Sequence, residues 1–454
     1  MKPSDLTSFP ADFRWGVATA AYQIEGATDE GGRGASIWDT FAATPGLVRN
    51  GDTADVADDH YHRWQGDLDL MASLGITHYR MSLAWSRLQP TGSGELSREG
   101  LAFYRDLLTG MRDRGITPLV TLYHWDLPQT LEDAGGWANR DTAHRFAEYA
   151  SRVVSELGFL AADWITINEP WCVSFLGYGN GAHAPGKRDT RLAVAAAHHT
   201  NLAHGLALAA IRMIDPNLRV SNSNLVTDLV PATESAEDAA AVVRLDAMNN
   251  RVFLDPVYRG EYSDTVHELF DEFGLSDVIH EGDLELIGRP VDYVGLNHYQ
   301  RIVVSSDETA GYLRLTERPA DPATTSFGWS VVPDSLRSVL ARIKRDYSDL
   351  PIYVTENGAS YNDYADPNGE VNDPERVEFL NGYLAAAAVA IREGVNLQGY
   401  YAWSFLDNFE WAEGYSKRFG LVYVDYPTQV RIPKQSAYWY RQLIADHAAS
   451  TAQN

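Results

Sequence analysis

The sequence predicts an α/β fold in which eight parallel strands and their helices close into a single (β/α)8 TIM barrel. Short, nearly continuous hydrophobic runs alternate with longer helical patterns along the chain, which is typical of parallel strands buried on both faces. No Pro-, Ser- or Gly-rich linker, internal repeat or isolated block of charge divides the sequence. We therefore expect one domain over residues 1–454, with its core at about 9–446.

Each hydrophobic run has the length of a strand, and each intervening segment has the length and periodicity of a helix. The expected strands are, in order, Trp15–Ala20, Thr77–Leu83, Thr117–Tyr123, Trp164–Asn168, Arg219–Asn224, Val291–Asn297, Ile352–Thr355 and Leu397–Trp403. The expected helices are Ala57–Leu74, Ser97–Arg114, Arg140–Leu157, Arg191–Ile214, Pro333–Asp346 and Asp373–Glu393.

The main alternative architecture is a doubly wound open sheet. Such a sheet usually carries a glycine-rich turn after its first strand, and the stretch from Gly16 to Gly26 has none. The glycines in Gly177-x-Gly179-x-x-Ala182 do not lie between a strand and a helix with an acidic partner at the right distance. No phosphate-binding P-loop sequence is present, so we expect no cofactor.

Charge and cysteine content exclude several partners. The chain has 37 Lys plus Arg against 62 Asp plus Glu, a net charge of −25, which disfavours both nucleic acids and anionic membranes. Its single cysteine, Cys172, allows neither an internal disulfide nor a cysteine-based zinc site, and we expect no metal. No apolar run is long enough to span a membrane. We expect a cytoplasmic protein with a small-molecule partner; the sequence leaves homo-oligomerisation open.

Polar and aromatic residues gather where the expected strands end. In an α/β barrel these ends form the catalytic face. A packed core would not place such side chains there, because an unsatisfied buried polar group costs about 1–3 kcal/mol. The residues at these ends are Gln23, Arg80, His124, Trp125, Asn168, Glu169, Asn297, Tyr299, Glu356, Trp403, Glu410 and Trp411. Amides, carboxylates and indoles together suit a polyhydroxylated sugar ring.

Two glutamates carry the chemical hypothesis. Glu169 follows Thr166-Ile167-Asn168, and Glu356 follows Val354-Thr355, so each lies just past a strand. The fourth and seventh strands can face each other across a barrel. Two carboxylates are what cleavage of a glycosidic bond requires, one to protonate the leaving oxygen and one to attack the anomeric carbon or activate water. The pair predicts a glycosidase.

Six sequence blocks resemble glycoside hydrolase family 1, the β-glucosidase family. Thr166–Pro170 is similar to the family's acid/base motif and Ile352–Gly358 to its nucleophile motif. The segments Phe9–Gly26, Tyr79–Arg87, His124–Pro128 and Trp403–Trp411 resemble further family blocks in the family's order. The resemblance covers the chain from about Phe9 to Tyr440.

The resemblance implies a retaining, exo-acting β-glucosidase that hydrolyses terminal β-D-glucosyl residues of short β-glucosides and cello-oligosaccharides. It implies that Glu169 is the acid/base and Glu356 the nucleophile, with Arg80 and Tyr299 holding the nucleophile. The residues it implies for substrate binding are Gln23, His124, Trp125, Asn168, Asn297, Tyr299, Trp403, Glu410 and Trp411 around the terminal sugar, with Trp171 and Trp329 on the aglycone side.

Two alternatives stay open at this point. One is a 6-phospho-β-glycosidase of the same family, which Glu410 disfavours because a carboxylate near O4 and O6 of the sugar would repel a phosphate. The other is a non-catalytic glycan-binding protein on a hydrolase scaffold, which the presence of both catalytic glutamates disfavours. The sequence does not decide between glucose, galactose, fucose and xylose.

Overall fold

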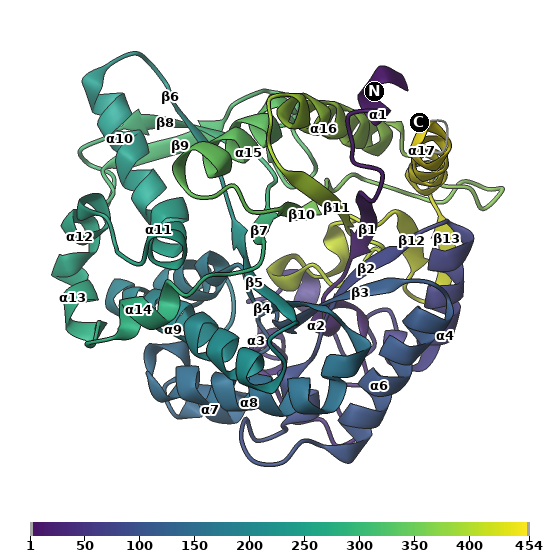
Figure 1. The fold of residues 1–454 in the computed structure, drawn as a ribbon, viewed down its shortest axis with the longest axis horizontal. Coiled ribbons are helices and arrows are strands. Elements are labelled where there is room, and N and C mark those ends of the chain that lie inside the picture. The colour runs from purple at the N-terminus through teal and green to yellow at the C-terminus, as the bar shows by residue number, and fades with distance from the viewer. Residues whose placement is uncertain (1–2, 452–454) are drawn as a thin grey trace.

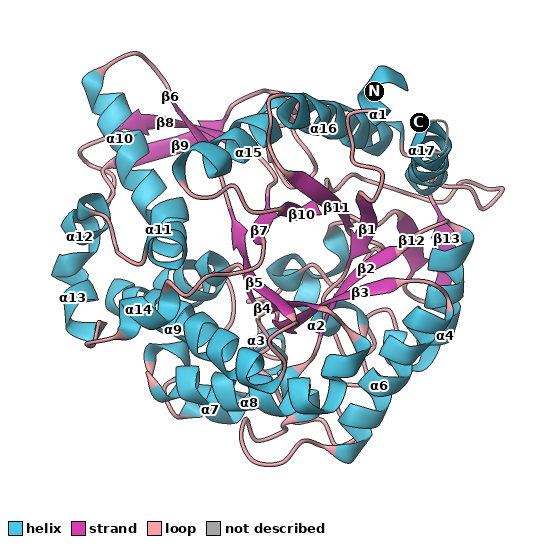
Figure 2. Cartoon of the chain, viewed as in Figure 1, coloured by secondary structure: helices cyan, strands magenta, loops and turns pink. Residues whose placement is uncertain are grey.

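A computed structural model describes residues 3–451 and contains a closed barrel of eight parallel strands, which confirms the predicted fold class (Figures 1 and 2). The strand order around the barrel is β1-β11-β10-β7-β5-β4-β3-β2, and β1 pairs with both β11 and β2 to close it. The barrel strands are β1 (Arg14–Ala18), β2 (His78–Ser82), β3 (Thr117–Tyr123), β4 (Asp163–Asn168), β5 (Arg219–Leu225), β7 (Val294–Asn297), β10 (Ile352–Asn357) and β11 (Leu397–Trp403). All eight correspond to predicted strands.

Long helices cover the outside of the barrel, as expected. The predicted helices appear as α4 (His60–Ser73), α6 (Arg98–Asp113), α8 (Asp141–Leu157), α9 (Thr190–Ile214), α15 (Asp334–Asp346) and α16 (Pro374–Arg392), and α17 (Gln435–Thr451) is an addition. Capping fixes their starts: Ser97 Oγ accepts from the Gly100 N–H at 3.2 Å before α6, and Asp189 accepts from the Arg191 N–H at 2.8 Å before α9. In α8, Phe146, Ala150 and Val153 are among the buried residues whose helical spacing forms the face turned to the barrel. The first helix, α1 (Pro3–Leu6), lies beside α16 and α17, so the two ends of the described chain are neighbours.

Several elements between the barrel strands were not predicted. A three-stranded sheet of β6 (Asp228–Pro231), β8 (Arg301–Ser306) and β9 (Leu315–Pro319) stands beside a group of helices at one side of the barrel (Figure 2). Those helices are α10 (Ala236–Asp246), α11 (Val252–Arg259), α12 (Asp264–Phe270), α13 (Leu275–Val278) and α14 (Asp283–Ile287). A hairpin, β12 (Val422–Asp425) and β13 (Val430–Pro433), follows the last barrel strand, and the remaining short helices are α2 (Ala21–Ile24), α3 (Ile37–Ala42), α5 (Trp85–Leu88) and α7 (Gln129–Asp133). None of the helices within residues 3–451 is both long and apolar enough to cross a membrane.

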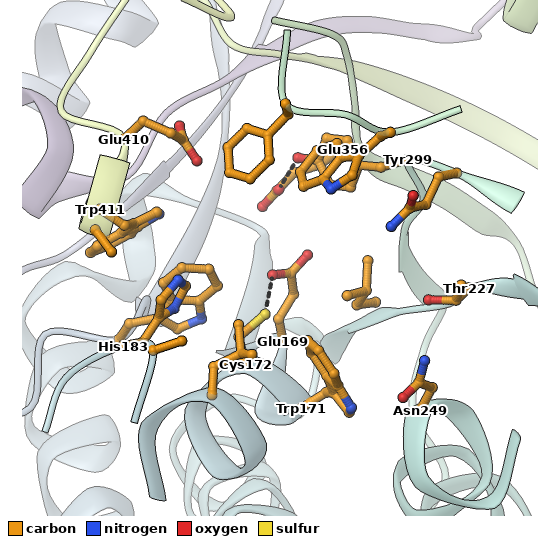
Figure 3. A pocket seen from close by; sticks show the side chains of 18 of the residues that line it. Glu169, Trp171, Cys172, His183, Thr227, Asn249, Tyr299, Glu356, Glu410 and Trp411 are labelled. Carbon is orange, nitrogen blue, oxygen red and sulfur yellow. Dashed lines mark hydrogen bonds between the residues drawn. The ribbon is translucent and has the colours of Figure 1, made fainter. Parts of the chain in front are cut away.

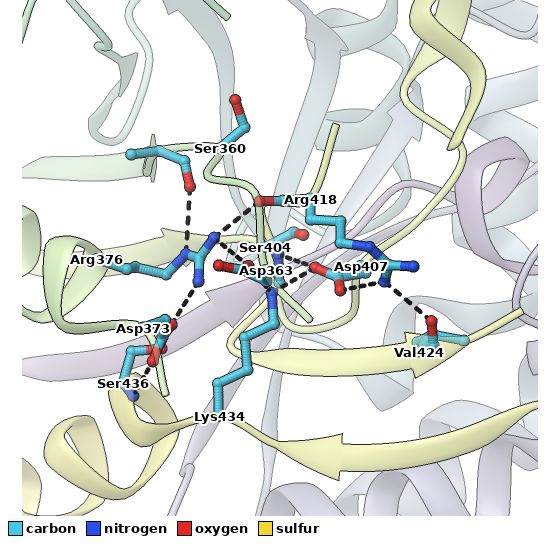
Figure 4. A network of polar contacts seen from close by, with 12 residues as sticks. Ser360, Asp363, Asp373, Arg376, Ser404, Asp407, Arg418, Val424, Lys434 and Ser436 are labelled. Carbon is cyan, nitrogen blue, oxygen red and sulfur yellow. Dashed lines mark hydrogen bonds and ion pairs between the residues drawn. The ribbon is translucent and has the colours of Figure 1, made fainter. Parts of the chain in front are cut away.

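A buried network of charges holds together the segments that follow the last two barrel strands (Figure 4). Lys434, whose side chain is fully buried, contacts Asp363 at 2.5 Å and Asp407 at 2.7 Å. Arg376 pairs with Asp363 at 2.7 Å, and Arg418 pairs with Asp407 at 2.7 Å. Because Asp407 lies between Trp403 and Glu410, the network anchors the loop that carries part of the predicted site.

Candidate active site

A cavity of about 540 Å3 opens at the carboxyl ends of the barrel strands and collects most of the predicted site residues (Figure 3). The predicted residues that line it are His124, Trp125, Glu169, Trp171, Tyr299, Trp329, Glu356, Trp403, Glu410 and Trp411. The other predicted residues, Gln23, Arg80, Asn168 and Asn297, are buried immediately behind this lining and contact it through hydrogen bonds.

Glu356 is held by two donors at the end of β10. The Arg80 guanidinium on β2 pairs with Oε1 of Glu356, and the Tyr299 phenol donates to Oε2 at 2.6 Å. Burial and the charge of Glu356 raise the pKa of Tyr299 well above its usual value, so the phenol keeps its proton. The two donors fix the direction of the Glu356 carboxylate. The role of Arg80 and Tyr299 in supporting a nucleophile stays a prediction.

Glu169 lies directly after β4 in a very different environment. Burial and the charge of Glu356 raise the pKa of Glu169 to about 8. Asn297 Nδ2 donates to its Oε1 at 2.7 Å, and the Cys172 thiol donates to its Oε2 at 3.2 Å. At neutral pH the two carboxyl groups of the cavity therefore differ: one is paired with a cation and the other keeps a proton.

A polar chain of fixed direction runs from Arg80 to His124. Arg80 Nη2 donates to Asn168 Oδ1 at 2.5 Å, so the amide nitrogen of Asn168 faces His124 Nε2, at 3.0 Å. The Nε2 atom must then be an acceptor, which leaves the proton on Nδ1. Burial and the nearby Arg80 charge lower the pKa of His124 well below its usual value, so the ring is neutral. His124 Nδ1 has no protein partner among residues 3–451 and is free to donate to a ligand.

Gln23 and Glu410 form a second polar pair at the edge of the cavity. Gln23 Nε2 donates to Asn408 Oδ1 and the Phe409 carbonyl at 3.0 Å, and to Glu410 Oε2 at 3.3 Å. Its Oε1 has no protein partner within the described part of the chain. Burial and the charge of Glu356 raise the pKa of Glu410 to about 8. Charge repulsion of a phosphate by Glu410 is thus weaker at neutral pH than the sequence argument assumed.

Indole rings form one wall of the cavity. The rings of Trp125 and Trp411 lie 4.5 Å apart, and the His124 ring is stacked on Trp403 with the centroids 5.9 Å apart.

A side chain on Gly358 would place its Cβ 1.7 Å from the Trp403 carbonyl oxygen, so only glycine allows the ends of β10 and β11 to lie this close.

Three lining residues have left-handed backbone conformations, which non-glycine residues rarely adopt. These are Trp125 (φ 79°), Glu169 (φ 46°) and Trp411 (φ 52°). Such conformations persist only where the surrounding structure enforces them, and they cluster at functional sites. All three side chains line the cavity.

The cavity lining also contains residues that the sequence analysis missed. Trp171 was predicted there, as was Trp329, whose ring stacks on Phe327 at 4.3 Å and lies 5.0 Å from Tyr299. The missed lining residues are Cys172, Leu176, Asn180, Ala182, His183, Leu225, Thr227, Met248, Asn249, Gln300, Ile302, Glu317, Phe327, Ala412, Glu413 and Phe419. Thr227 and Asn249 lie on the side of the cavity opposite Glu410 and Trp411 (Figure 3). Met248, Asn249, Ile302 and Glu317 come from the unpredicted insertions, where no motif marks them.

Known proteins of one family match this chain over nearly its full length. The model of glycosyl hydrolase family 1 matches residues 6–449. The β-glucosidase A of Thermotoga maritima is 44% identical, with 98% of this chain and 99% of that protein covered. A 1,4-β-D-glucan glucohydrolase of Thermotoga neapolitana is 42% identical, with 97% and 99% covered. A solved structure of the T. maritima β-glucosidase in complex with deoxynojirimycin superposes with a TM-score of 0.92 at 42% identity, covering 97% of this chain and 99% of that chain.

Proposed function

The chain belongs to glycosyl hydrolase family 1, and we propose that it is an exo-acting β-glucosidase that removes terminal β-D-glucosyl residues from short β-glucosides and cello-oligosaccharides by double displacement with retention. The observation that carries the proposal is the pair of buried carboxyl groups, Glu169 and Glu356, which share one cavity but have opposite environments. A retaining glycosidase needs this contrast, because one group must start protonated and the other ionised.

In the first step of the proposed mechanism, Glu356 attacks the anomeric carbon while Glu169 gives its proton to the leaving oxygen. Arg80 and Tyr299 hold the Glu356 carboxylate in place until it attacks. Once Glu356 is esterified its negative charge is gone, and the pKa of Glu169 falls because that charge was one of the two causes that raised it. Glu169 then acts as the base that activates water, and hydrolysis of the ester returns both groups to their starting states.

The sugar is held by the polar atoms that the protein leaves without partners. His124 Nδ1 donates to one hydroxyl and Gln23 Oε1 accepts from another, while Glu410 binds a further pair. The indole wall of Trp403 and Trp411 covers an apolar face of the ring. Asn168 and Asn297 orient His124 and Glu169, and Trp125 borders the same subsite.

The aglycone occupies the outer half of the cavity in this proposal. Trp171 and Trp329 flank that half, and the apolar side chains of Leu225, Met248 and Phe327 continue it outward. A terminal sugar in the inner half and an aglycone in the outer half give exo action. The solved T. maritima enzyme bound to deoxynojirimycin supports a small-molecule partner.

The two alternatives from the sequence find no support. The relatives are named as β-glucosidases or a glucohydrolase, and both catalytic carboxyl groups line the cavity. The expectations of a cytoplasmic location and of a single domain over 1–454 stay predictions; residues 1–2 and 452–454 lie outside the described part of the chain.

Turnover of aryl β-glycosides tests the proposal. We expect hydrolysis of 4-nitrophenyl β-D-glucoside and of cellobiose, with the β-anomer of glucose released first when the products are followed by NMR. A panel of glucoside, galactoside, fucoside and xyloside, compared by kcat/KM, defines the preferred sugar. No turnover of any β-glycoside, or release of α-glucose first, contradicts the proposal; Glu356→Gln serves as the inactive control for contaminating activity.

A further inference from the structure

One carboxyl oxygen of Glu169, Oε1, accepts a hydrogen bond from the side chain of Asn297. Asn297 Nδ2 donates to Oε1 of Glu169 at 2.7 Å and to Asn168 Oδ1 at 3.1 Å. Asn297 Oδ1 faces the hydroxyls of Ser223 and Thr355, at 2.9 and 2.7 Å. These hydroxyls also lie 2.5 Å from each other, so one donates to the other and at least one proton remains for Asn297 Oδ1.

This arrangement prevents the Asn297 amide from turning over. A flipped amide would point its oxygen at Oε1 of Glu169 and at Asn168 Oδ1, which itself accepts from Arg80. Since Asn297 always donates to Oε1, a proton on that oxygen would face an N–H. The proton of a neutral Glu169 therefore resides on Oε2.

The only protein group that contacts Oε2 by a hydrogen bond within residues 3–451 is the thiol of Cys172, with Sγ at 3.2 Å (Figure 3). Cys172 begins the π-helical segment Cys172–Gly179, three residues after Glu169, and is buried in the cavity lining. Burial and the charge of Glu169 raise the pKa of Cys172 well above its usual value, so the thiol stays protonated. A thiol is a weak donor and a weak acceptor.

We propose that Cys172 is a positioning residue for the acid/base, whose weak thiol contact with Oε2 of Glu169 leaves that oxygen able to give up the catalytic proton and to take it back. This inference rests on the proposed function, in which Glu169 is the general acid. When Glu169 is ionised, the thiol donates to Oε2. When Oε2 is protonated, the S–H turns away, and only a weak hydrogen bond is lost. A hydroxyl at the same position would bind the carboxylate much more strongly than the neutral acid, because hydrogen bonds to ionised groups are about twice as strong.

The other groups around Glu169 set the background against which the thiol acts. Glu356 raises the affinity of Glu169 for its proton, and the Arg80 charge and the Asn297 hydrogen bond lower it. The remaining titratable groups of the cavity are Tyr299, His124, His183, Glu317, Glu410 and Glu413. Tyr299, His124 and His183 are neutral near pH 7, and Glu410 and Glu169 disfavour each other's charge. Substitution of Cys172 changes none of these side chains.

The test is the pH profile of kcat/KM for phenyl β-D-glucoside, whose poor leaving group needs the acid. Cys172→Ser supplies a stronger donor, so the alkaline limb should move to lower pH by about half a unit to one unit. Cys172→Ala removes the donor, so the limb should move to higher pH. The acidic limb should not move in either variant. The matched control is Ser174→Cys, which makes the reverse exchange in the same segment; Ser174 Oγ donates to the Pro170 carbonyl at 2.7 Å and does not contact Glu169.

The outcomes separate this inference from the function on which it rests. If Glu169→Gln keeps the wild-type alkaline limb, the assignment of the acid is wrong. If Glu169→Gln loses the limb but both Cys172 variants keep it within 0.2 units (roughly the error of such a profile), or move it in the same direction, the inference about Cys172 alone is overturned. Melting curves of both variants show whether the fold is intact, and two small substitutions of opposite expected sign keep the test decisive if one folds poorly.

Discussion

The Tyr299 phenol donates to Oε2 of Glu356 at 2.6 Å, although Tyr299 follows β7, Glu356 lies in β10 and the two residues are 57 positions apart. With the Arg80 guanidinium on the other carboxylate oxygen, this contact leaves Glu356 no freedom to rotate. The arrangement holds the carboxylate in one direction, which a nucleophile for an anomeric carbon needs.

Glu356→Ala should lower kcat for every β-glucoside by roughly 10⁴-fold or more, because no glycosyl-enzyme can form. Added azide should restore part of the turnover and give the α-glycosyl azide, since the small anion attacks from the space left by the carboxylate. Kinetics with and without azide, together with NMR of the product, check this. Near-normal hydrolysis without added anion would show that another residue is the nucleophile.

Glu169→Ala should discriminate between leaving groups. Dinitrophenolate departs without a proton, so formation of the glycosyl-enzyme from dinitrophenyl glucoside should survive the substitution. Cellobiose and alkyl glucosides should lose the general-acid contribution of roughly 10²–10⁴-fold in kcat/KM. For the dinitrophenyl substrate, kcat and KM should fall together because hydrolysis of the intermediate also loses its base.

The pH dependence of the wild-type enzyme checks the same assignment. Because burial and Glu356 raise the pKa of Glu169 to about 8, kcat/KM should decline on the alkaline side near that pH. The limb should be absent in Glu169→Ala and in the volume-matched Glu169→Gln. An equal loss for all leaving groups, with the limb retained, would assign the proton to a different residue.

Glu410→Ala should reduce kcat/KM for glucosides by about 10–100-fold, the factor expected for a lost hydrogen bond to an ionisable group. The loss should be smaller for xylosides, which lack the hydroxymethyl group, because part of the contact is already missing. Parallel measurement of both substrates on wild type and variant isolates the contact with the sugar. The idea fails if the two substrates lose the same factor.

The raised pKa values of Glu169 and Glu410 should make the folded protein less stable against unfolding as pH rises. Both are about 8 in the folded protein and about 4.5 as ordinary glutamates, so the unfolded chain releases these protons first as pH rises. Stability should therefore fall between pH 4.5 and 8 through these groups. The difference in Tm between Glu169→Gln and wild type should therefore become more positive from pH 5 to pH 8. A constant difference in Tm over that range would contradict the raised pKa of Glu169.

Lys434→Met should destabilise the protein by about 3–5 kcal/mol, because it leaves Asp363 and Asp407 buried with fewer cations. The matched control is Lys344→Met, at an exposed lysine that donates to the Gly394 carbonyl, which should change stability by less than about 1 kcal/mol. Denaturant unfolding of both variants provides the comparison. Equal effects would mean that the network adds nothing beyond ordinary surface contacts.

Much of the architecture was predictable from local pattern. All eight barrel strands and six covering helices were found because strands buried on both faces are apolar runs, and helices repeat their apolar residues every three to four positions. The small sheet β6-β8-β9 and the helices α10–α14 were missed. The strands of this sheet are short and partly exposed, so they lack the long apolar runs by which the barrel strands were predicted.

The sequence by itself determined which chemistry this protein carries, because Glu169, Glu356 and their strand-end neighbours are recognisable from residue type and order. Only the tertiary structure decided how that chemistry is tuned. The contact of Asn297 with Glu169 and the pairing of Arg80 with Glu356 join residues that local sequence does not relate. Closure of the barrel creates these contacts, since burial and proximity across strands, which set the pKa of each carboxyl group, exist only in the folded chain.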